Sequence, residues 1–419
     1  MPSGALDRTR FMEPRVRVAV QVAVETTTVS SPGGLRILDR DDGRVAALAG
    51  PHDVWRFRAQ DGVLDAMPAG RADGADAFER PATSASEAGA PSPETSGRAL
   101  RAVTVEVREG DAPIFLHGKP YRGSAELVAL PHRGLNVINF VSLEDYLLGV
   151  VPSEIGPREP EEFAAVAAQA IAARTYAIAN LGSHLEMGFD LFATVADQVY
   201  EGMLAEREDA TRAVRETAGR ILTYQGEPIR AYYHSTCGGR TAAVTEVLDR
   251  PDAPYLRPVL DRDDEGRDFC SISPRYRWTE EFDGSALNAV VREELARYFG
   301  VTEREIGPLE RVEVRSRTRT GRVRELAIRG PGSEFVLSRN DIRFVLRNAE
   351  GQILNSTNFD VVDGEKGTGS SLHGRGYGHG VGMCQFGAVG RARAGQSWEK
   401  IVRAYYVGTE VTRLYGEGE

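Results

Sequence analysis

In one stretch of the chain, residues 371–387, glycine occupies every second position from Gly374 to Gly382 and returns at Gly387. Each glycine removes a side chain and tolerates positive φ, at an entropic cost of roughly 0.5–1 kcal/mol relative to alanine, so this many glycines do not serve stability. They indicate a backbone that lies close to something else, either a polymer substrate or the domain's own core in a tight crossing. The spacing matches neither the P-loop nor the dinucleotide-binding pattern, so the stretch does not predict a phosphate cradle.

The composition places the chain among globular proteins large enough for two or three domains. It has 419 residues, of which 41% are hydrophobic and 27% charged. A net charge of -10 argues against a nucleic-acid-binding coat. No apolar run approaches the eighteen or so residues of a transmembrane segment, and residues 1–23 lack the pattern of a signal peptide.

The pattern along the chain predicts an α+β protein in three parts. Residues 1–67 contain short alternating strand segments and are expected to form a small β-rich unit. Residues 68–99 are rich in Ala, Gly, Ser, Pro and acidic residues and predict a flexible linker. Residues 100–415 mix further strands with helical segments, expected at 160–181, 206–218, 285–299, 341–346, 383–394 and 398–405.

Two helices frame the first candidate catalytic residue, Glu154. Ser142 opens a capping-box pattern, and the helix that follows is expected to stop near Gly149 because Pro152 comes next. Glu154 then lies on a turn, where catalytic carboxylates are often found, although most acids are simply solvated. On the Ala-rich helix at 160–181, Arg174 shares the small-residue face and is expected to point inward, towards a partner or a cleft; a snorkelling residue at the edge of the core is the alternative.

The three cysteines are an odd number and do not form a disulfide framework, so Cys237, Cys270 and Cys384 are expected to be free thiols or metal ligands. Cys237 follows His234 by three residues, a combination suited to zinc, with Cys270 as a third ligand; a buried thiol beside a hydrogen-bonded histidine is the alternative. Cys384 has apolar neighbours and is expected to be a buried small hydrophobic residue, or else a nucleophile paired with a histidine of the glycine-rich stretch.

Six blocks of the sequence, taken together, closely resemble the SpoIID/LytB family, which includes the sporulation stage II protein D and the amidase modifier LytB. They are residues 142–154, 167–177, 197–202, 232–239, 373–388 and 405–410. The blocks occur in the order found in the family, and the match covers roughly residues 102–414.

This resemblance implies a peptidoglycan lytic transglycosylase that cleaves between N-acetylmuramic acid and N-acetylglucosamine with a 1,6-anhydro product. Glu154 would be the general acid and base, in a glycan-binding cleft between its loop and the glycine-rich stretch. The implied substrate-binding residues are Arg174, Gln198, Tyr200, His373, His379 and Gln385.

The resemblance also implies cofactors, partners and a location. Some members carry a structural zinc ion beside the block that contains His234 and Cys237, and Cys270 is added here as the next ligand. Peptidoglycan glycan strands and a cell-wall amidase are the implied partners, and the implied location is extracytoplasmic, in the cell wall or periplasm. Two rivals stay open: a non-catalytic, wall-binding enhancer of an N-acetylmuramoyl-L-alanine amidase, and a zinc-dependent hydrolase with an open metal position.

Overall fold

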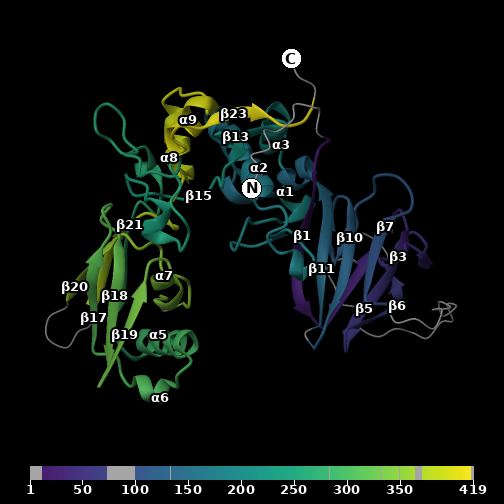
Figure 1. Cartoon of the computed structure of the whole chain (residues 1–419), viewed down its shortest axis with the longest axis horizontal. Coiled ribbons are helices and arrows are strands. Elements are labelled where there is room, and N and C mark those ends of the chain that lie inside the picture. The colour runs from purple at the N-terminus through teal and green to yellow at the C-terminus, as the bar shows by residue number, and fades with distance from the viewer. Residues whose placement is uncertain are drawn as a thin grey trace. The chain divides into compact units, whose positions relative to one another are not determined.

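The computed structural model describes residues 12–72, 100–132, 134–282, 284–330, 332–348, 350–363 and 370–416 (Figure 1). The chain divides into two compact units. Unit 1 comprises Met1–Arg158, Ala173–Ile221 and Thr412–Glu419, and unit 2 comprises Glu159–Ala172 and Leu222–Val411. Helices occur together with sheets whose strands are mostly antiparallel, which confirms the predicted α+β class.

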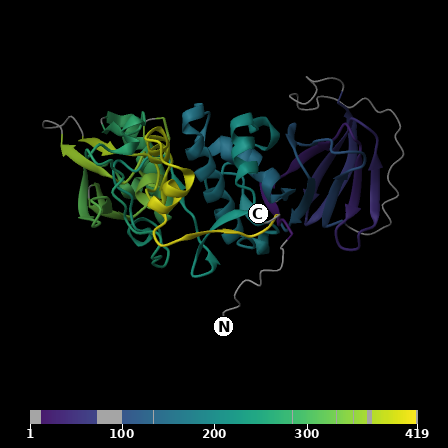
Figure 2. The same ribbon diagram turned by 90° about the horizontal axis from the view of Figure 1, so that it is seen from above.

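Two sheets dominate unit 1, with strand orders β12-β1-β11-β10-β7-β3-β4 and β6-β5-β2-β8-β9. Strands β10 and β11 of the first contact β5 of the second. Figure 2 shows the purple and blue strands of unit 1 side by side. The strands are β1 (Arg15–Val24), β2 (Thr26–Ser30), β3 (Leu35–Asp39), β4 (Val45–Ala49), β5 (Asp53–Gln60), β6 (Val63–Arg71), β7 (Ala102–Val107), β8 (Ile114–Leu116), β9 (Lys119–Tyr121), β10 (Ser124–Leu130), β11 (Gly134–Ser142) and β12 (Leu191–Phe192).

The strands before residue 72 do not form a unit of their own, in contrast to the expected division at residue 67. The alternating residues of β1 bury Val16 and Val18, and β1 pairs antiparallel with β11. Likewise β3 pairs with β7, and β2 pairs with β8. Most of the predicted linker, residues 73–99, lies outside the described residues, and β6 continues past Pro68 to Arg71.

Helix α1, Leu143–Ile155, begins where the capping pattern predicted it. The Oγ of Ser142 accepts a hydrogen bond from the Asp145 N–H at 3.3 Å. This bond satisfies one of the backbone donors that have no partner inside a helix. The helix then runs through Pro152 and ends at Gly156, whose φ is +70°.

The predicted end of this helix near Gly149 is therefore wrong. A side chain at Gly149 would lie 2.7 Å from the ring of Tyr200, so this glycine allows close packing and does not end the helix. A proline inside a helix costs about 3 kcal/mol. The burial of Val150 and Val151, at roughly 1.5–3 kcal/mol each, offsets that cost. Glu154 consequently lies on the last turn of a helix and not on a loop.

The remaining helices of unit 1 are short, apart from α2, which runs from unit 2 into unit 1. They are α2 (Phe163–Ala179), η3 (Leu185–Met187), η4 (Gly202–Ala205) and α3 (Glu208–Glu216).

Unit 2 contains the sheets β17-β18-β19 and β16-β21-β20 and the parallel pair β15-β22. Another small sheet has the order β14-β13-β23. The strands are β13 (Arg220–Tyr224), β14 (Glu227–Pro228), β15 (Tyr233–His234), β16 (Arg277–Phe282), β17 (Arg311–Arg317), β18 (Val323–Gly330), β19 (Ser333–Ser338), β20 (Phe359–Asp363), β21 (Ser370–Arg375), β22 (Met383–Cys384) and β23 (Glu410–Arg413). The helices are η2 (Pro160–Glu162), α4 (Val244–Val247), η5 (Phe269–Ile272), α5 (Gly284–Phe299), α6 (Glu303–Ile306), α7 (Asp341–Val345), α8 (Gln385–Arg393) and α9 (Trp398–Tyr405).

The glycine-rich stretch crosses the segment at residues 232–238 at very short range. A Cβ at Gly376 would lie 2.5 Å from the carbonyl oxygen of Thr236. A Cβ at Gly382 would overlap the carbonyl oxygen of Tyr232. Backbone hydrogen bonds join the same segments, including one from Met383 N–H to the Tyr232 carbonyl at 3.1 Å. Of the two occupants left open above, the protein's own backbone is therefore the one that accounts for these glycines.

Two glycines with nearly the same positive φ separate the cost of this crossing from the cost of positive φ. Gly382 has φ +72° and Gly395 has φ +75°, but nothing lies within 4 Å of a Cβ at Gly395. Gly395→Ala should cost about 1–2 kcal/mol of unfolding free energy. Gly382→Ala should cost roughly 1–3 kcal/mol more, because the methyl group overpacks the crossing. Urea unfolding of both variants measures the difference; equal costs would contradict the close crossing.

Candidate functional site

Glu154 is half-buried at the C-terminal end of α1. The Val199 N–H donates a hydrogen bond to its Oε1 at 2.8 Å. This contact holds one carboxylate oxygen at a defined position on a rigid element. It also joins two of the blocks that carried the family resemblance: residues 142–154, most of which form α1, and residues 197–202.

Gln198 and Tyr200 of that block are buried. The Tyr146 hydroxyl of α1 donates to Oε1 of Gln198 at 3.2 Å, and the Gln198 amide donates to the Ala173 carbonyl at 3.3 Å. The Tyr200 hydroxyl donates to Oδ1 of Asn139 at 2.8 Å. The two side chains thus hold this block against its neighbours. Neither is exposed, although a residue that lines a cleft was expected to be.

Arg174 also departs from that expectation, because its side chain is fully buried. Its guanidinium donates to both carboxylate oxygens of Glu144, at 2.8 and 2.7 Å, and to the Val214 carbonyl at 3.1 Å. Such bidentate pairs are strong and geometrically specific. Arg174 points inward as predicted, but its guanidinium is used within unit 1.

Glu144 is the partner of Arg174 and connects several parts of unit 1. Its carboxylate also accepts hydrogen bonds from the Tyr415 hydroxyl and the Gly219 N–H. Burial raises the pKa of Glu144, but the hydrogen bond and charge of Arg174, followed by the other two donors, outweigh burial and hold the pKa below 4.5. The Glu144 carboxylate is therefore ionised at neutral pH.

The residues expected from the glycine-rich stretch differ in exposure. His373 on β21 is exposed, and its Nε2 lies 3.0 Å from the Ser371 hydroxyl. Gln385 is 6% exposed and donates to Oε1 of Gln169 at 3.4 Å. His379 lies between these extremes and accepts the Val381 N–H on Nδ1 at 3.1 Å.

His234 and His379 are neighbours, with ring centroids 5.5 Å apart. Burial, followed by the charges of nearby basic groups, lowers the pKa of each ring well below 6.5, so both are neutral at neutral pH. His234 Nδ1 lies 3.0 Å from the Val381 carbonyl and must carry the proton, because that oxygen only accepts. The buried Nε2 of His234 has no hydrogen-bond partner among the described residues.

Glu154 belongs to unit 1, whereas His373, His379 and Gln385 belong to unit 2. The predicted glycan-binding cleft between their segments therefore stays a prediction.

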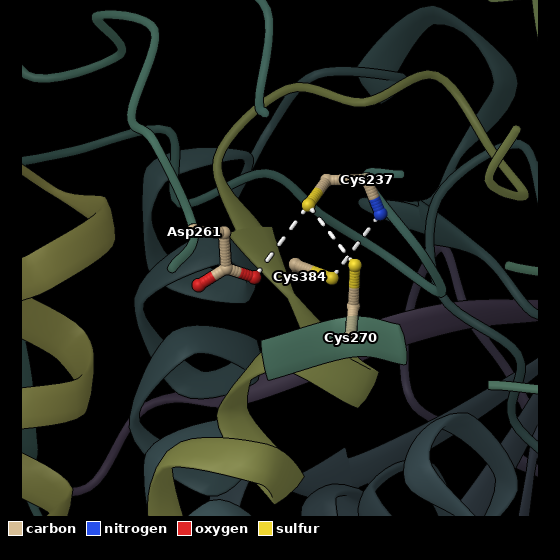
Figure 3. A group of neighbouring side chains, drawn as sticks. All are labelled: Cys237, Asp261, Cys270 and Cys384. Carbon is tan, nitrogen blue, oxygen red and sulfur yellow. Dashed lines mark hydrogen bonds between the residues drawn. The ribbon is translucent and has the colours of Figure 1, made fainter. Parts of the chain in front are cut away.

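The three cysteines and Asp261 form a cluster of possible metal ligands, Cys237, Asp261, Cys270 and Cys384 (Figure 3). All four side chains are buried, and their ligand atoms lie within 4.8 Å of one another. Cys237 Sγ is 3.5 Å from Cys270 Sγ and 3.5 Å from Asp261 Oδ2. His234, which the sequence predicted as a ligand together with Cys237 and Cys270, does not belong to this group.

The surroundings of the cluster affect its ionisable groups differently. Burial raises the pKa of the Cys237 and Cys384 thiols. Hydrogen bonds from these two thiols lower the pKa of Cys270 to about 4. Burial raises the pKa of Asp261 to about 6, although the charge of Arg391 opposes this shift.

Asp261 was not predicted as a ligand, and Cys384, although considered as a free thiol or a metal ligand, was not placed in the predicted ligand set with Cys237 and Cys270. Cys384 lies 147 residues after Cys237, and the parallel pairing of β15 with β22 brings the two together. Asp261 belongs to an acidic run, residues 261–265, that carries no metal-binding spacing. Only the oddness of the cysteine count hinted that Cys384 belonged with the other two.

Family models match two adjoining parts of the chain. The model of the stage II sporulation protein SpoIID matches residues 131–224. A domain of unknown function, DUF8618, matches residues 242–382. The first contains Glu154, Arg174, Gln198 and Tyr200, and the second contains most of the glycine-rich stretch.

Several curated proteins are similar over most of the chain. An uncharacterized protein of Brachyspira hyodysenteriae is 31% identical over 314 residues, 74% of this chain and 76% of that protein. The stage II sporulation protein D of Bacillus subtilis is 30% identical over 287 residues, 65% of this chain and 75% of its own length. The amidase enhancer of Bacillus subtilis is 29% identical over 347 residues, 76% of this chain but 48% of the enhancer.

Among the described residues, no helix combines the length and the hydropathy that crossing a membrane requires.

The pair of Glu144 with Arg174 predicts a pH-dependent contribution to stability. Glu144→Gln leaves the buried guanidinium without its counter-ion and should cost roughly 3–5 kcal/mol of unfolding free energy at pH 7. Because folding holds the pKa of Glu144 below 4.5, the carboxylate stabilises the folded state above pH 4.5, and this contribution is lost as the pH falls through the folded pKa. The difference in unfolding free energy between the variant and the wild type should therefore decrease as the pH is lowered.

Glu106→Gln is the matched control, since Glu106 pairs with Arg36 at the surface, with side chains 36% and 51% exposed. It should cost less than about 1 kcal/mol. Denaturant unfolding from pH 7 to pH 3 compares the two variants. A Glu144→Gln cost that equals the control, or that does not change with pH, would contradict this account.

Proposed function

The chain belongs to the SpoIID family of stage II sporulation proteins, and from this we propose that it is a lytic transglycosylase that cleaves peptidoglycan glycan strands. Relatives named for sporulation and for the enhancement of an amidase support a role at the cell wall, and an extracytoplasmic location follows from that role. The observation that carries the proposed chemistry is the placement of Glu154, half-buried on the last turn of α1 with one oxygen held by a backbone N–H.

The reaction needs one carboxyl group in two successive roles. As an acid, Glu154 gives its proton to the glycosidic oxygen while the bond from that oxygen to C1 of the muramic acid breaks. As a carboxylate, it then takes the proton of the C6 hydroxyl, whose oxygen forms the new bond to C1. Glu154 ends as it began, no water is consumed, and the product carries a 1,6-anhydro ring.

Hydrolysis by inversion or retention would need a second carboxylate close to the bond. Asp197 is the acid considered for this role, because, besides burial, its charge and that of Glu154 both raise the pKa of Tyr146, and both acids therefore lie near this ring. Its carboxylate already accepts the Tyr176 hydroxyl at 2.9 Å and the Phe192 N–H at 2.9 Å. These bonds support a positioning role for Asp197, which favours the one-carboxylate reaction over hydrolysis.

Among the residues that the family resemblance implied for substrate binding, His373 has the exposure that a glycan contact requires. We assign it to the hydroxyl or N-acetyl groups of the sugars, with His379 beside it in the same stretch. Arg174, Gln198, Tyr200 and Gln385 are buried, so their proposed contribution is to hold the shape of the segments around them.

A second candidate is enhancement of a cell-wall amidase without cleavage of glycan. It is favoured by the similarity to the amidase enhancer, which extends over 76% of this chain. This activity would use glycan binding and would not need the proton of Glu154. The zinc-dependent hydrolase considered from the sequence needs an open coordination position, whereas the cluster in unit 2 offers four protein ligands in a buried place.

Glu154→Gln tests the proposed catalysis. The amide oxygen of glutamine can still accept the Val199 N–H, so the melting temperature should stay close to that of the wild type. Because the titratable proton is lost, turnover of purified peptidoglycan should fall by roughly 10² to 10⁴, while glycan binding persists. Glu186→Gln, at an exposed position of unit 1, is the control and should keep full activity.

Analysis of the products separates the candidates. The wild type should release 1,6-anhydro-muramyl ends; reducing ends would indicate hydrolysis, and free peptides would indicate an amidase. Wild-type turnover by Glu154→Gln would falsify the assigned role. If neither protein cleaves glycan but both stimulate a separate amidase, the enhancer candidate holds.

His373→Ala tests the proposed glycan contact. The side chain is exposed and β21 is held by its backbone pairing, so the substitution should leave stability unchanged within about 0.5 kcal/mol. Removal of one hydrogen-bonding side chain should weaken the binding of glycan fragments about 3- to 10-fold. Lys400→Ala, also exposed in unit 2, should bind like the wild type in the same titration. Equal affinities for all three proteins would exclude His373 from the binding surface.

A further inference from the structure

We propose that Cys237, Asp261, Cys270 and Cys384 bind one zinc ion in a closed, structural site inside unit 2. This inference rests on the four side chains and their surroundings and is independent of the proposed glycan cleavage. It replaces the ligand set expected from the sequence, in which His234 took the place of Asp261 and Cys384.

The separations within the cluster fit the requirements of zinc. With zinc–sulfur bonds of about 2.3 Å and zinc–oxygen bonds of about 2.1 Å, a tetrahedral site has sulfurs about 3.8 Å apart and a sulfur–oxygen edge of about 3.6 Å. The Cys237 Sγ lies 3.5 Å from each of two neighbours, Cys270 Sγ and Asp261 Oδ2. All separations are within 4.8 Å, and in Figure 3 the four side chains point toward one another. Thiolate-rich tetrahedral sets are typical of zinc among the common divalent metals.

Asp261 presents one oxygen to the sulfurs and uses the other to fix its orientation. Oδ1 accepts hydrogen bonds from the Tyr405 hydroxyl at 2.8 Å and from Arg391 Nε at 3.1 Å. Oδ2 faces Cys237. A Cβ at Gly387 would overlap Oδ2, so this glycine leaves the carboxylate the space it occupies. Hydrogen bonds that orient a ligating carboxylate in this way are a regular feature of metal sites.

The Sγ of Cys384 accepts two backbone hydrogen bonds, from the Cys237 N–H and the Gly387 N–H, both at 3.2 Å. The second lies at the start of α8, where unpaired N–H groups and the helix dipole favour negative charge. In its thiol form, Cys384 donates to the Ser235 carbonyl at 3.6 Å, a bond that it would give up on binding metal. Two donors on one sulfur suit a thiolate, the form in which cysteine binds metal.

The charge of the zinc site would balance two buried arginines. Three thiolates and one carboxylate around a divalent ion leave a net charge of about -2. Arg391 contacts Asp261, and Arg322 donates to the Cys237 carbonyl at 3.1 Å. Arg322 is 1% exposed, its Nη1 has no hydrogen-bond partner in the described part of the chain, and the three cysteines act on it electrostatically together with Glu246. Buried charge of this kind needs compensation nearby.

The ligands come from four segments with little regular structure between them. Cys237 follows β15, Asp261 lies in a long connection, Cys270 is in η5, and Cys384 ends β22. An ion bound by all four ties these segments together without leaving a position for substrate. Its role would therefore be to stabilise unit 2.

Metal analysis of the full chain, purified with reducing agent and without chelator, tests the site directly. About one zinc per chain is expected, and its removal should lower the melting temperature. Replacement by cobalt should give the visible absorption of a tetrahedral ion together with thiolate charge-transfer bands. These measurements use the wild type, so they do not depend on whether any variant folds.

Three variants test the ligand set. Cys384→Ser and Asp261→Asn should each weaken zinc binding at least about 10²-fold in competition with a chelating dye, since even residues that only orient ligands are worth 10- to 100-fold. His234→Asn is the control, because His234 lies outside the cluster, and it should bind zinc within about threefold of the wild type.

Two results would overturn the proposal. Wild-type protein without zinc that gives no cobalt spectrum would exclude the site. If protein prepared without reducing agent were then two hydrogens short in mass, peptide mapping would show which of the three cysteines form a disulfide instead. Loss of zinc in His234→Asn with retention in Asp261→Asn would restore the ligand set expected from the sequence. Failure of glycan cleavage would affect neither result.

Discussion

The crossing of the glycine-rich stretch over residues 232–238 is the contact on which the arrangement of unit 2 depends. Its hydrogen bonds pair Tyr377 with Thr236 and bring Met383 to Tyr232. Because the two backbones touch, the chain leaves the crossing with Cys384 beside Cys237 and α8 already oriented. Gly380 belongs to the same crossing and leaves room for the buried guanidinium of Arg322. One run of small residues thus sets the positions of a helix, a charge and a cluster of thiols.

Local signals in the sequence predicted the local structure well. The cap at Ser142 is present, and the helices expected at 285–299, 341–346 and 398–405 occur as α5, α7 and α9 within a residue or two. These predictions succeed because capping and hydrophobic periodicity depend on residues a few positions apart. Pro152 shows where local prediction fails. The cost of a proline inside a helix was recognised, but the helix continues because Val150 and Val151 are buried, and that burial depends on distant parts of the chain.

The candidate sites were predicted less completely for the same reason. Glu154 was chosen from its block and is half-buried on a helix end, a placement that supports its proposed role. Arg174 was expected to face a partner or a cleft, but no local pattern identified Glu144, 30 residues away, as the partner that fixes it in the core. Spacing offered His234 as a companion of Cys237, whereas the actual neighbours arrive through pairings of strands and turns that no local pattern encodes.

Because unit 1 is built from separate segments of the chain, some of its contacts can form only late in translation. Its last segment supplies Tyr415, which donates to Glu144, and Leu414, whose N–H donates to the Gly219 carbonyl. Both contacts must wait until all of unit 2 has left the ribosome. Long-range contacts of this kind slow folding, since a large loop closes before they form. During translation, Glu144, the counter-ion of Arg174, therefore gains its last hydrogen bond only after unit 2 has been synthesised. Unit 2 can fold before that bond forms.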